Sequence, residues 1–197
     1  MPTLTTVIST IVLVASVALH TPSRGRPSSH TVLLRSATGQ STFRVPAVAQ
    51  VVENSLFSFY VKYPSGNLFV PTKALVREDV RVLVAAKERE RMRSTAKLGE
   101  QYTLVETLGR FKVYQASFQS RNAALPTVET IFVTTDAAGQ NVMITDPGTW
   151  STAFRVYRPY STSIELDYQF RKSLGINEFE KVDAFVLDVV RTMQVAN

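Results

Sequence analysis

The sequence of 197 residues contains no cysteine, and both of its histidines, His20 and His30, lie near the N-terminus. The absence of cysteine excludes disulfides, iron–sulfur clusters, cysteine-ligated zinc and thiol nucleophiles. Without histidine after residue 30, the rest of the chain cannot form a Ser-His-Asp triad or an imidazole metal site. No glycine-rich phosphate-binding motif is present. Catalysis would therefore depend on carboxylates, lysine, tyrosine or serine, and we expect no cofactor.

Acidic residues are missing from the first quarter of the chain, in which Glu53 is the first acid. Residues 1–52 carry four arginines and no lysine, whereas residues 53–197 carry 18 basic and 16 acidic residues, a net charge of +2. The formal net charge of +6 therefore comes mostly from the N-terminal segment. A nearly neutral domain lacks the basic surface that nucleic-acid binding requires, so we expect no nucleic-acid partner.

The first 18 residues have the features of a signal peptide. Residues 4–19 form an uncharged, mostly apolar run, which is shorter than the ~20 residues that a membrane-spanning helix needs. Ser16 and Ala18 are small residues at the positions that a signal peptidase reads, which predicts cleavage after Ala18. A retained membrane anchor and a buried hydrophobic helix are the alternatives.

Residues 19–52 have the composition of a transit peptide, because they are rich in serine, threonine and arginine and contain no acid. A signal peptide followed by such a stretch resembles the two-part presequences of algae with secondary plastids, and a second small-residue cleavage site lies at residues 47–49. This pattern predicts delivery to a plastid thylakoid. The alternatives are a disordered linker in place of the transit peptide, and a secreted or membrane-anchored protein.

Residues 53–197 are expected to form one globular α+β domain. Apolar and polar residues alternate with a period of two in several stretches between residues 56 and 171, which predicts an antiparallel sheet of about seven strands. Residues 63–66, Tyr-Pro-Ser-Gly, predict a turn after the first of these strands. Residues 87–97 are polar and predict a helix that ends at Gly99.

The C-terminal residues predict an amphipathic helix that packs on this sheet. Asn177 and Glu180 have the spacing of a capping box at its start. Phe185 is expected to be buried between the helix and the sheet. The apolar positions, which recur at spacings of three and four with Phe185 and Val190 widening the face, are Phe179, Val182, Val186, Val189 and Met193.

Two groups of charged residues are candidates for function. Glu165 and Asp167 lie two residues apart on one face of an expected strand, close enough to share a calcium ion or to act as an acid/base pair, although a solvated strand face has the same pattern. A basic patch is the candidate partner-binding site, although a solvated helix face is again the alternative. The basic patch consists of Lys87, Arg89, Arg91, Arg93 and Lys97.

Two segments resemble the PsbP-like family. Residues 57–66, Phe-Ser-Phe-Tyr-Val-Lys-Tyr-Pro-Ser-Gly, are similar to the opening strand and Tyr-Pro turn of these domains, and residues 178–195 are similar to their terminal helix. The resemblance implies an α-β-α sandwich and a non-catalytic accessory role at photosystem II, and it assigns no site residues. The expected partner is therefore a membrane protein complex, and no small-molecule substrate is identified. A small-ligand or lipid carrier is the alternative function, followed by a carboxylate-dependent enzyme.

Overall fold

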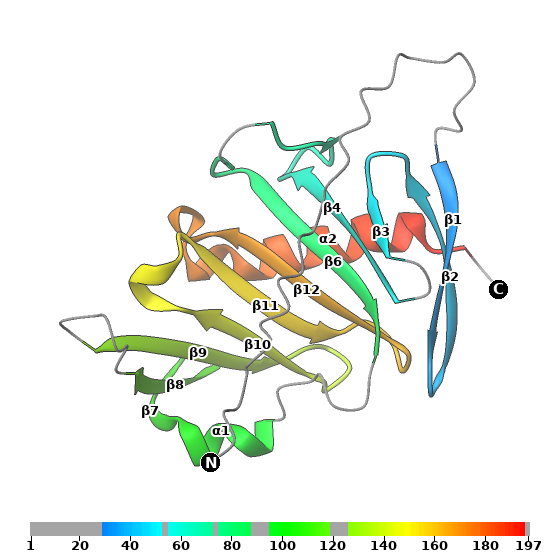
Figure 1. Ribbon diagram of the computed structural model, residues 1–197. Coiled ribbons are helices and arrows are strands. Elements are labelled where there is room, and N and C mark those ends of the chain that lie inside the picture. Colours follow the sequence, from blue (N-terminus) through cyan, green and yellow to red (C-terminus); the bar gives the residue numbers. More distant parts are fainter. Residues whose placement is uncertain (1–28, 53–54, 73–74, 88–94, 119–125, 196–197) are drawn as a thin grey trace, which may run out of the picture.

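The computed structural model describes residues 29–52, 55–72, 75–87, 95–118 and 126–195. It contains a ten-stranded antiparallel sheet, a separate two-stranded hairpin and a long C-terminal helix (Figure 1). The α+β class and the antiparallel pairing are confirmed, whereas the sheet has more strands than the seven expected. The strands are β1 (Ser29–Ser36), β2 (Gly39–Pro46), β3 (Gln50–Val52), β4 (Leu56–Lys62), β5 (Leu68–Phe69), β6 (Asp79–Ala86), β7 (Thr103–Leu108), β8 (Phe111–Phe118), β9 (Thr127–Thr135), β10 (Asn141–Asp146), β11 (Ala153–Pro159) and β12 (Ile164–Arg171). The helices are α1 (Thr95–Gln101) and α2 (Phe179–Met193), with single 3₁₀ turns at Gly148–Trp150, Lys172–Leu174 and Ile176–Glu178.

The sheet is built around a meander in which β7 to β12 pair consecutively. The last strand of the meander, β12, then pairs with β6, which in turn pairs with β4. Tight turns join many of these strands, and Gly109 adopts a positive φ of 57° between β7 and β8, as the expected hairpin requires. Short connections of this kind favour antiparallel pairing, because a parallel crossover needs a dozen or more residues.

One face of the sheet, here called the helix face, carries the main apolar core. In β12 every second side chain is buried there, at Ile164, Leu166, Tyr168 and Phe170, while the residues between them are only half-buried. The strands on either side contribute further apolar side chains to the same core, among them Val82 and Val156. The alternation read from the sequence is therefore confirmed.

Helix α2 packs across the helix face, behind the sheet in the view of Figure 1. Its buried residues are Phe179, Val182, Val186, Val190 and Met193. Val190 thus occupies the buried position expected of Val189, and Phe185 is half-buried with its ring 5.3 Å from that of Tyr63. The predicted capping box is wrong, because a 3₁₀ turn precedes the helix and Glu178 is its N-cap without a side-chain hydrogen bond.

The hairpin β1–β2 corrects the interpretation of residues 19–52 as a transit-like or linker segment. Val32, Leu34, Phe43 and Val45 of the hairpin are buried in the main core. The backbone amide of Val195, just beyond α2, donates a hydrogen bond to the carbonyl of Thr42 at 2.9 Å. Residues 29–52 therefore belong to the folded domain, which the sequence had placed at residues 53–197. Cleavage after Ala18 would leave the hairpin intact, whereas cleavage at residues 47–49 would remove its core side chains.

The opposite face of the sheet, here called the second face, is covered at one corner by α1. Leu98 of this helix packs with Ile131, Val133 and Met143 in a small apolar cluster. Helix α1 continues through Gly99, so the prediction that this glycine ends the helix is wrong. Among the helices of the described ranges, none is both long and apolar enough to cross a membrane. The predicted signal segment, residues 1–18, lies outside the described residues.

A buried network of charges joins α2 to the sheet. The guanidinium of Arg158, on β11, donates hydrogen bonds to Asp183 of α2 and to Asp136 in the β9–β10 turn, the latter at 2.8 Å. Only 6% of the Arg158 side chain is exposed. The hydroxyl of Tyr168 also donates to Asp183, at 2.7 Å. A buried charge is costly unless its partner lies at hydrogen-bonding distance. The network therefore favours the position of α2 in which Asp183 meets Arg158 and Tyr168.

Replacing Asp183 by alanine should destabilise the fold by about 3 kcal/mol, because it leaves the buried Arg158 charge with one carboxylate instead of two. The free energy of unfolding in urea measures this loss. Asp188→Ala is the matched control on the same helix, since 74% of the Asp188 side chain is exposed, and it should change stability by less than about 0.5 kcal/mol. Equal effects of the two substitutions would contradict the structural role of Asp183.

The pKa of Tyr168 predicts a loss of stability at alkaline pH. Burial, and secondarily the charge and hydrogen bond of Asp183, raise the pKa of the Tyr168 phenol well above its ordinary value. Above pH ~10 the unfolded chain loses this proton while the folded chain keeps it, so stability falls by about 1.4 kcal/mol per pH unit. Urea unfolding from pH 7 to 11 should show a shallower alkaline decline in Tyr168→Phe than in the wild type. Identical slopes would contradict this assignment.

Candidate functional site

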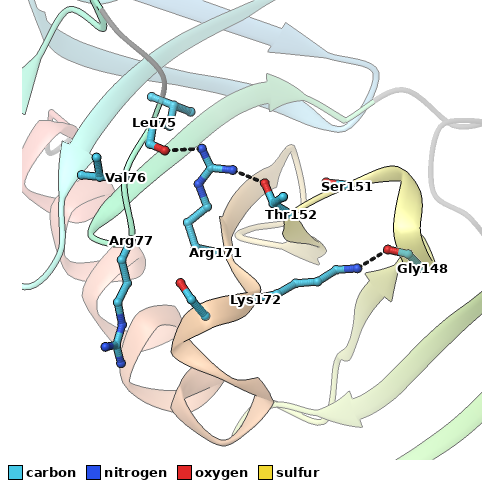
Figure 2. Close-up of a pocket in the computed structure, with 9 residues that line it drawn as sticks. Leu75, Val76, Arg77, Gly148, Ser151, Thr152, Arg171 and Lys172 are labelled. Atoms are coloured by element: carbon cyan, nitrogen blue, oxygen red, sulfur yellow. Dashed lines mark hydrogen bonds between the residues drawn. The ribbon is translucent and has the colours of Figure 1, made fainter.

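The candidate site is a basic cleft at one end of the sheet, where β12 ends and β11 and β6 begin (Figure 2). Its volume is about 700 Å³. The charged residues that line it are Arg77, Arg171 and Lys172, and none of its lining residues is acidic. Leu75 and Val76 supply an apolar wall, and hydroxyls of residues 151, 152 and 173 lie along its polar side.

Two of the cations hold the cleft together. Arg171, the last residue of β12, donates hydrogen bonds to the carbonyl of Leu75 and to the hydroxyl of Thr152, so it ties the β5–β6 loop to the start of β11 (Figure 2). Lys172 reaches in another direction, to the carbonyl of Gly148 and the carboxylate of Asp146. The end of β12 therefore anchors both walls of the cleft.

The third cation, Arg77, lies in a loop whose backbone is fixed by hydrogen bonds on either side of it. The buried carboxylate of Asp79 accepts a hydrogen bond from the amide of Val76 at 2.6 Å, and the amide of Asp79 donates to the carbonyl of Val76 at 3.1 Å. Lys62 forms an ion pair with the same carboxylate. This arrangement closes the loop at residues 76–79 and leaves the side chain of Arg77 exposed at the cleft.

The cleft is electropositive. Lys172 is neutralised by Asp146, but among the described residues Arg171 bonds only to a carbonyl and a hydroxyl, neither of which carries a full charge. Arg77 makes no hydrogen bond or ion pair with any residue in the described ranges. Two uncompensated guanidinium groups beside an apolar wall are suited to bind a carboxylate-bearing or other anionic group.

Only part of the predicted basic patch belongs to the described residues. Arg89, Arg91 and Arg93 lie outside the described residues, as does the side chain of Lys97. Lys87 is half-buried, and its backbone amide donates to the carbonyl of Ser163 at 2.8 Å. The basic patch therefore stays a prediction, and nothing places it beside the basic cleft.

Asp167, one member of the predicted acid/base pair, forms an ion pair with Arg155. Asp167 on the second face accepts hydrogen bonds from Arg155 of β11 on both carboxylate oxygens, with Nε at 3.0 and 3.1 Å. This bond raises the pKa of the Arg155 guanidinium, so the two groups form a stable ion pair. Within the described part of the chain, no three His, Asp or Glu side chains are close enough to hold a metal ion.

The sequence contained little signal for the basic cleft. Arg77 and Arg171 are far apart in the chain and belong to different strand ends. Arg77 is followed by Glu78 and Asp79, so its segment has no local excess of positive charge, and the two adjacent cations Arg171 and Lys172 are too short a run to indicate a site. The pairing of β12 with β6 and β11 is what brings these cations to one end of the sheet.

Comparisons with known proteins do not assign the chain to a family. No family model matches it, and no curated protein matches it. A solved structure that does match is the iron-regulated outer membrane lipoprotein FrpD of Neisseria meningitidis, with 10% sequence identity over 83% of this chain and 92% of that chain. The TM-score of 0.46 is too low to support an argument about function. The resemblance to the PsbP-like family remains a prediction.

Replacing Gly148, in the wall of the cleft, by a larger residue should destabilise the fold. Its φ is +67°, and a Cβ atom there would lie 2.6 Å from the carbonyl oxygen of Val128. Gly148→Ala should therefore lower the free energy of unfolding by about 2–4 kcal/mol, from backbone strain and overpacking together. Gly109→Ala is the matched control, because φ there is +57° with nothing within 4 Å, and it should cost only ~1 kcal/mol. Equal losses in urea unfolding would contradict the close approach at Gly148.

Proposed function

We propose that this protein is a non-catalytic accessory or assembly subunit that docks on an acidic surface of a membrane protein complex. The observation that carries the proposal is the basic cleft, in which Arg77 and Arg171 present positive charge that no carboxylate among the described residues neutralises. The occupant of the cleft is an acidic segment of the partner protein. Its carboxylates would bind the guanidinium groups, and its apolar side chains would contact Leu75 and Val76.

The chemistry of the described residues supports a binding role over a catalytic one. The carboxylate pair that the sequence suggested is weakened by the bond between Asp167 and Arg155, since a carboxylate held in an ion pair is a poor general base. Charge complementarity in an exposed cleft mainly speeds and orients association with a partner. A small-ligand or lipid carrier remains the alternative function.

The more specific form of the proposal is a PsbP-like accessory subunit of photosystem II in a plastid thylakoid. It is supported by the resemblance of residues 57–66 and 178–195 to the opening strand and the terminal helix of PsbP-like domains. Fractionation of native membranes tests it, because the protein would then co-purify with photosystem II. Recovery with a secreted or a different membrane fraction would overturn the photosystem form and leave docking through the basic cleft open to its own test.

Reversal of Arg77 should weaken docking without disturbing the fold. Arg77→Glu places a negative charge at the cleft, so association with native membranes should slow by about threefold to tenfold, and salt should release the variant at a lower concentration than the wild type. Arg81→Glu is the matched control, since Arg81 is an exposed cation of the adjoining strand β6 that does not line the cleft. Circular dichroism and urea unfolding check that both variants fold.

The basic patch provides the competing explanation, and a second variant separates the two surfaces. Reversing Arg89, Arg91 and Arg93 to glutamate should leave salt release unchanged if the basic cleft is the docking site. A loss confined to the triple variant would assign docking to the basic patch and overturn the role of the cleft. Binding that survives high salt in every variant would overturn electrostatic docking altogether.

A further inference from the structure

The outer edge of β7 is an interaction surface separate from the basic cleft. β7 is the last strand of the ten-stranded sheet, and β8 is the one described strand that pairs with it (Figure 1). All six of its residues are exposed. The backbone N–H and C=O groups along the open side of an edge strand form a template for pairing with another extended chain. The chemistry of this edge therefore fits a β-strand as its occupant.

The side chains of β7 favour such pairing. Leu104, Val105 and Leu108 are large apolar residues that are each about half exposed. The strand contains neither lysine nor proline, the residues with which native proteins commonly protect a free edge. Its one charged residue is Glu106, which makes no hydrogen bond or ion pair with any described residue. At the other end of the sheet, β3 has only three residues, and so short an edge is itself a form of protection.

A β-bulge at Val105 determines which side chains of β7 share the second face. Opposed residues of antiparallel strands place their side chains on the same face. Leu104 is opposite Tyr114, which packs in the apolar cluster of the second face, and Thr107 is opposite Lys112, two residues from Tyr114. Leu104 and Thr107 therefore both lie on the second face although they are three residues apart, because the bulge inserts Val105 between them.

The helix face of β7 carries the other side chains. Glu106 is opposite Val113, and Leu108 is opposite Phe111; both partners belong to the main core. Thr103, one residue before Leu104, is on the helix face as well. The first and last residues of β7 thus share one face, and the second and the fifth share the other.

We propose that β7 pairs antiparallel with β7 of a second copy of this chain, about a twofold axis between residues 105 and 106. In this register Thr103 is opposite Leu108 of the second copy, and Leu104 is opposite Thr107 of the second copy, so each of these pairs shares a face. A slip of one residue would oppose Leu104 to Glu106 or to Leu108, which lie on the other face. The bulge therefore makes the strand complementary to itself, as an isologous dimer requires.

The carboxylate of Glu106 limits the strength of this dimer. Val105 is opposite Glu106 of the second copy, so the two Glu106 side chains are diagonal neighbours across the axis, and like charges at that position repel. Pairing of six-residue strands also buries less than the ~1,200 Å² of a stable complex. We therefore expect a weak dimer. No residue of β7 lines the basic cleft, so the dimer and docking through the cleft succeed or fail separately.

Analytical ultracentrifugation of the full chain from about 1 µM to about 1 mM tests the proposal. We expect a monomer–dimer equilibrium, with slower amide hydrogen exchange at residues 103–108 as the concentration rises. Leu104→Lys combined with Leu108→Lys should weaken association at least about tenfold, because lysines protect an edge and the apolar contacts are lost. Val51→Lys combined with Val52→Lys is the matched control, since it places two lysines on β3 at the opposite end of the sheet. It should associate as the wild type does.

Two variants of Glu106 test the register. Glu106→Gln should strengthen association about twofold to fivefold, because it removes the repulsion across the axis. Asp188→Asn is the matched control, since it changes the net charge equally on the exposed side of α2 and should have no effect. A mixture of Glu106→Lys with the wild type should form a heterodimer that is stronger than either homodimer, because the introduced lysine lies beside Glu106 of the wild-type chain.

Three results would overturn the proposal. The first is a monomer over the whole concentration range. The second is association that the two lysines on β7 leave unchanged while circular dichroism shows a folded variant, which would assign the contact to another surface. The third is a mixture of Glu106→Lys and wild type that associates no more strongly than the wild type alone. This last result does not depend on the lysine variant of β7, so it decides the question even if that variant fails to fold.

Discussion

The carboxylate of Asp183 is the contact on which the arrangement of this fold depends. It accepts hydrogen bonds from Arg158 of β11 and Tyr168 of β12, and Arg158 continues the network to Asp136 in the β9–β10 turn. One side chain of α2 is thereby connected to three parts of the sheet. Apolar packing alone tolerates small shifts of a helix on a sheet, whereas buried charges need their partners at hydrogen-bonding distance. The network therefore determines where α2 lies, and with it the position of the hairpin β1–β2 against the end of that helix.

The two faces of the sheet differ in what covers them and in how polar their side chains are. The helix face packs against α2 and the hairpin, and most of its apolar side chains are buried in the main core. The second face is covered by α1 only at one corner among the described residues, and its central strands carry polar side chains. A second, smaller hollow of about 290 Å³ lies over β9 to β12 on the second face. Ser151, in the loop that contains Gly148, lines both this hollow and the basic cleft at the end of the sheet. Lys172 and Asp146 fix this loop, so both hollows share one rigid wall.

The elements that the sequence predicted well are those with one clearly apolar face. The strand at residues 56–62 and the C-terminal helix have regular periods, because in each of them a single face is buried. The hairpin β1–β2 was missed for the opposite reason. Its residues are rich in serine, threonine and arginine and lack acids, which is also the composition of a transit peptide, and only contact with α2 and the sheet buries Val32, Leu34, Phe43 and Val45.

The sequence by itself determined the α+β class, the antiparallel pairing and the absence of cysteine and histidine chemistry from most of the chain. These properties depend on composition, short connections and local periodicity, which need no knowledge of distant contacts. The tertiary structure alone decided the two hollows. Arg77 and Arg171 line one cleft, and Thr145 and Gln169 line one smaller hollow, only because β6, β10, β11 and β12 pair in one register. The side chains at a strand end or on a polar face have no periodic signal of their own, so their convergence is a consequence of the pairing between strands.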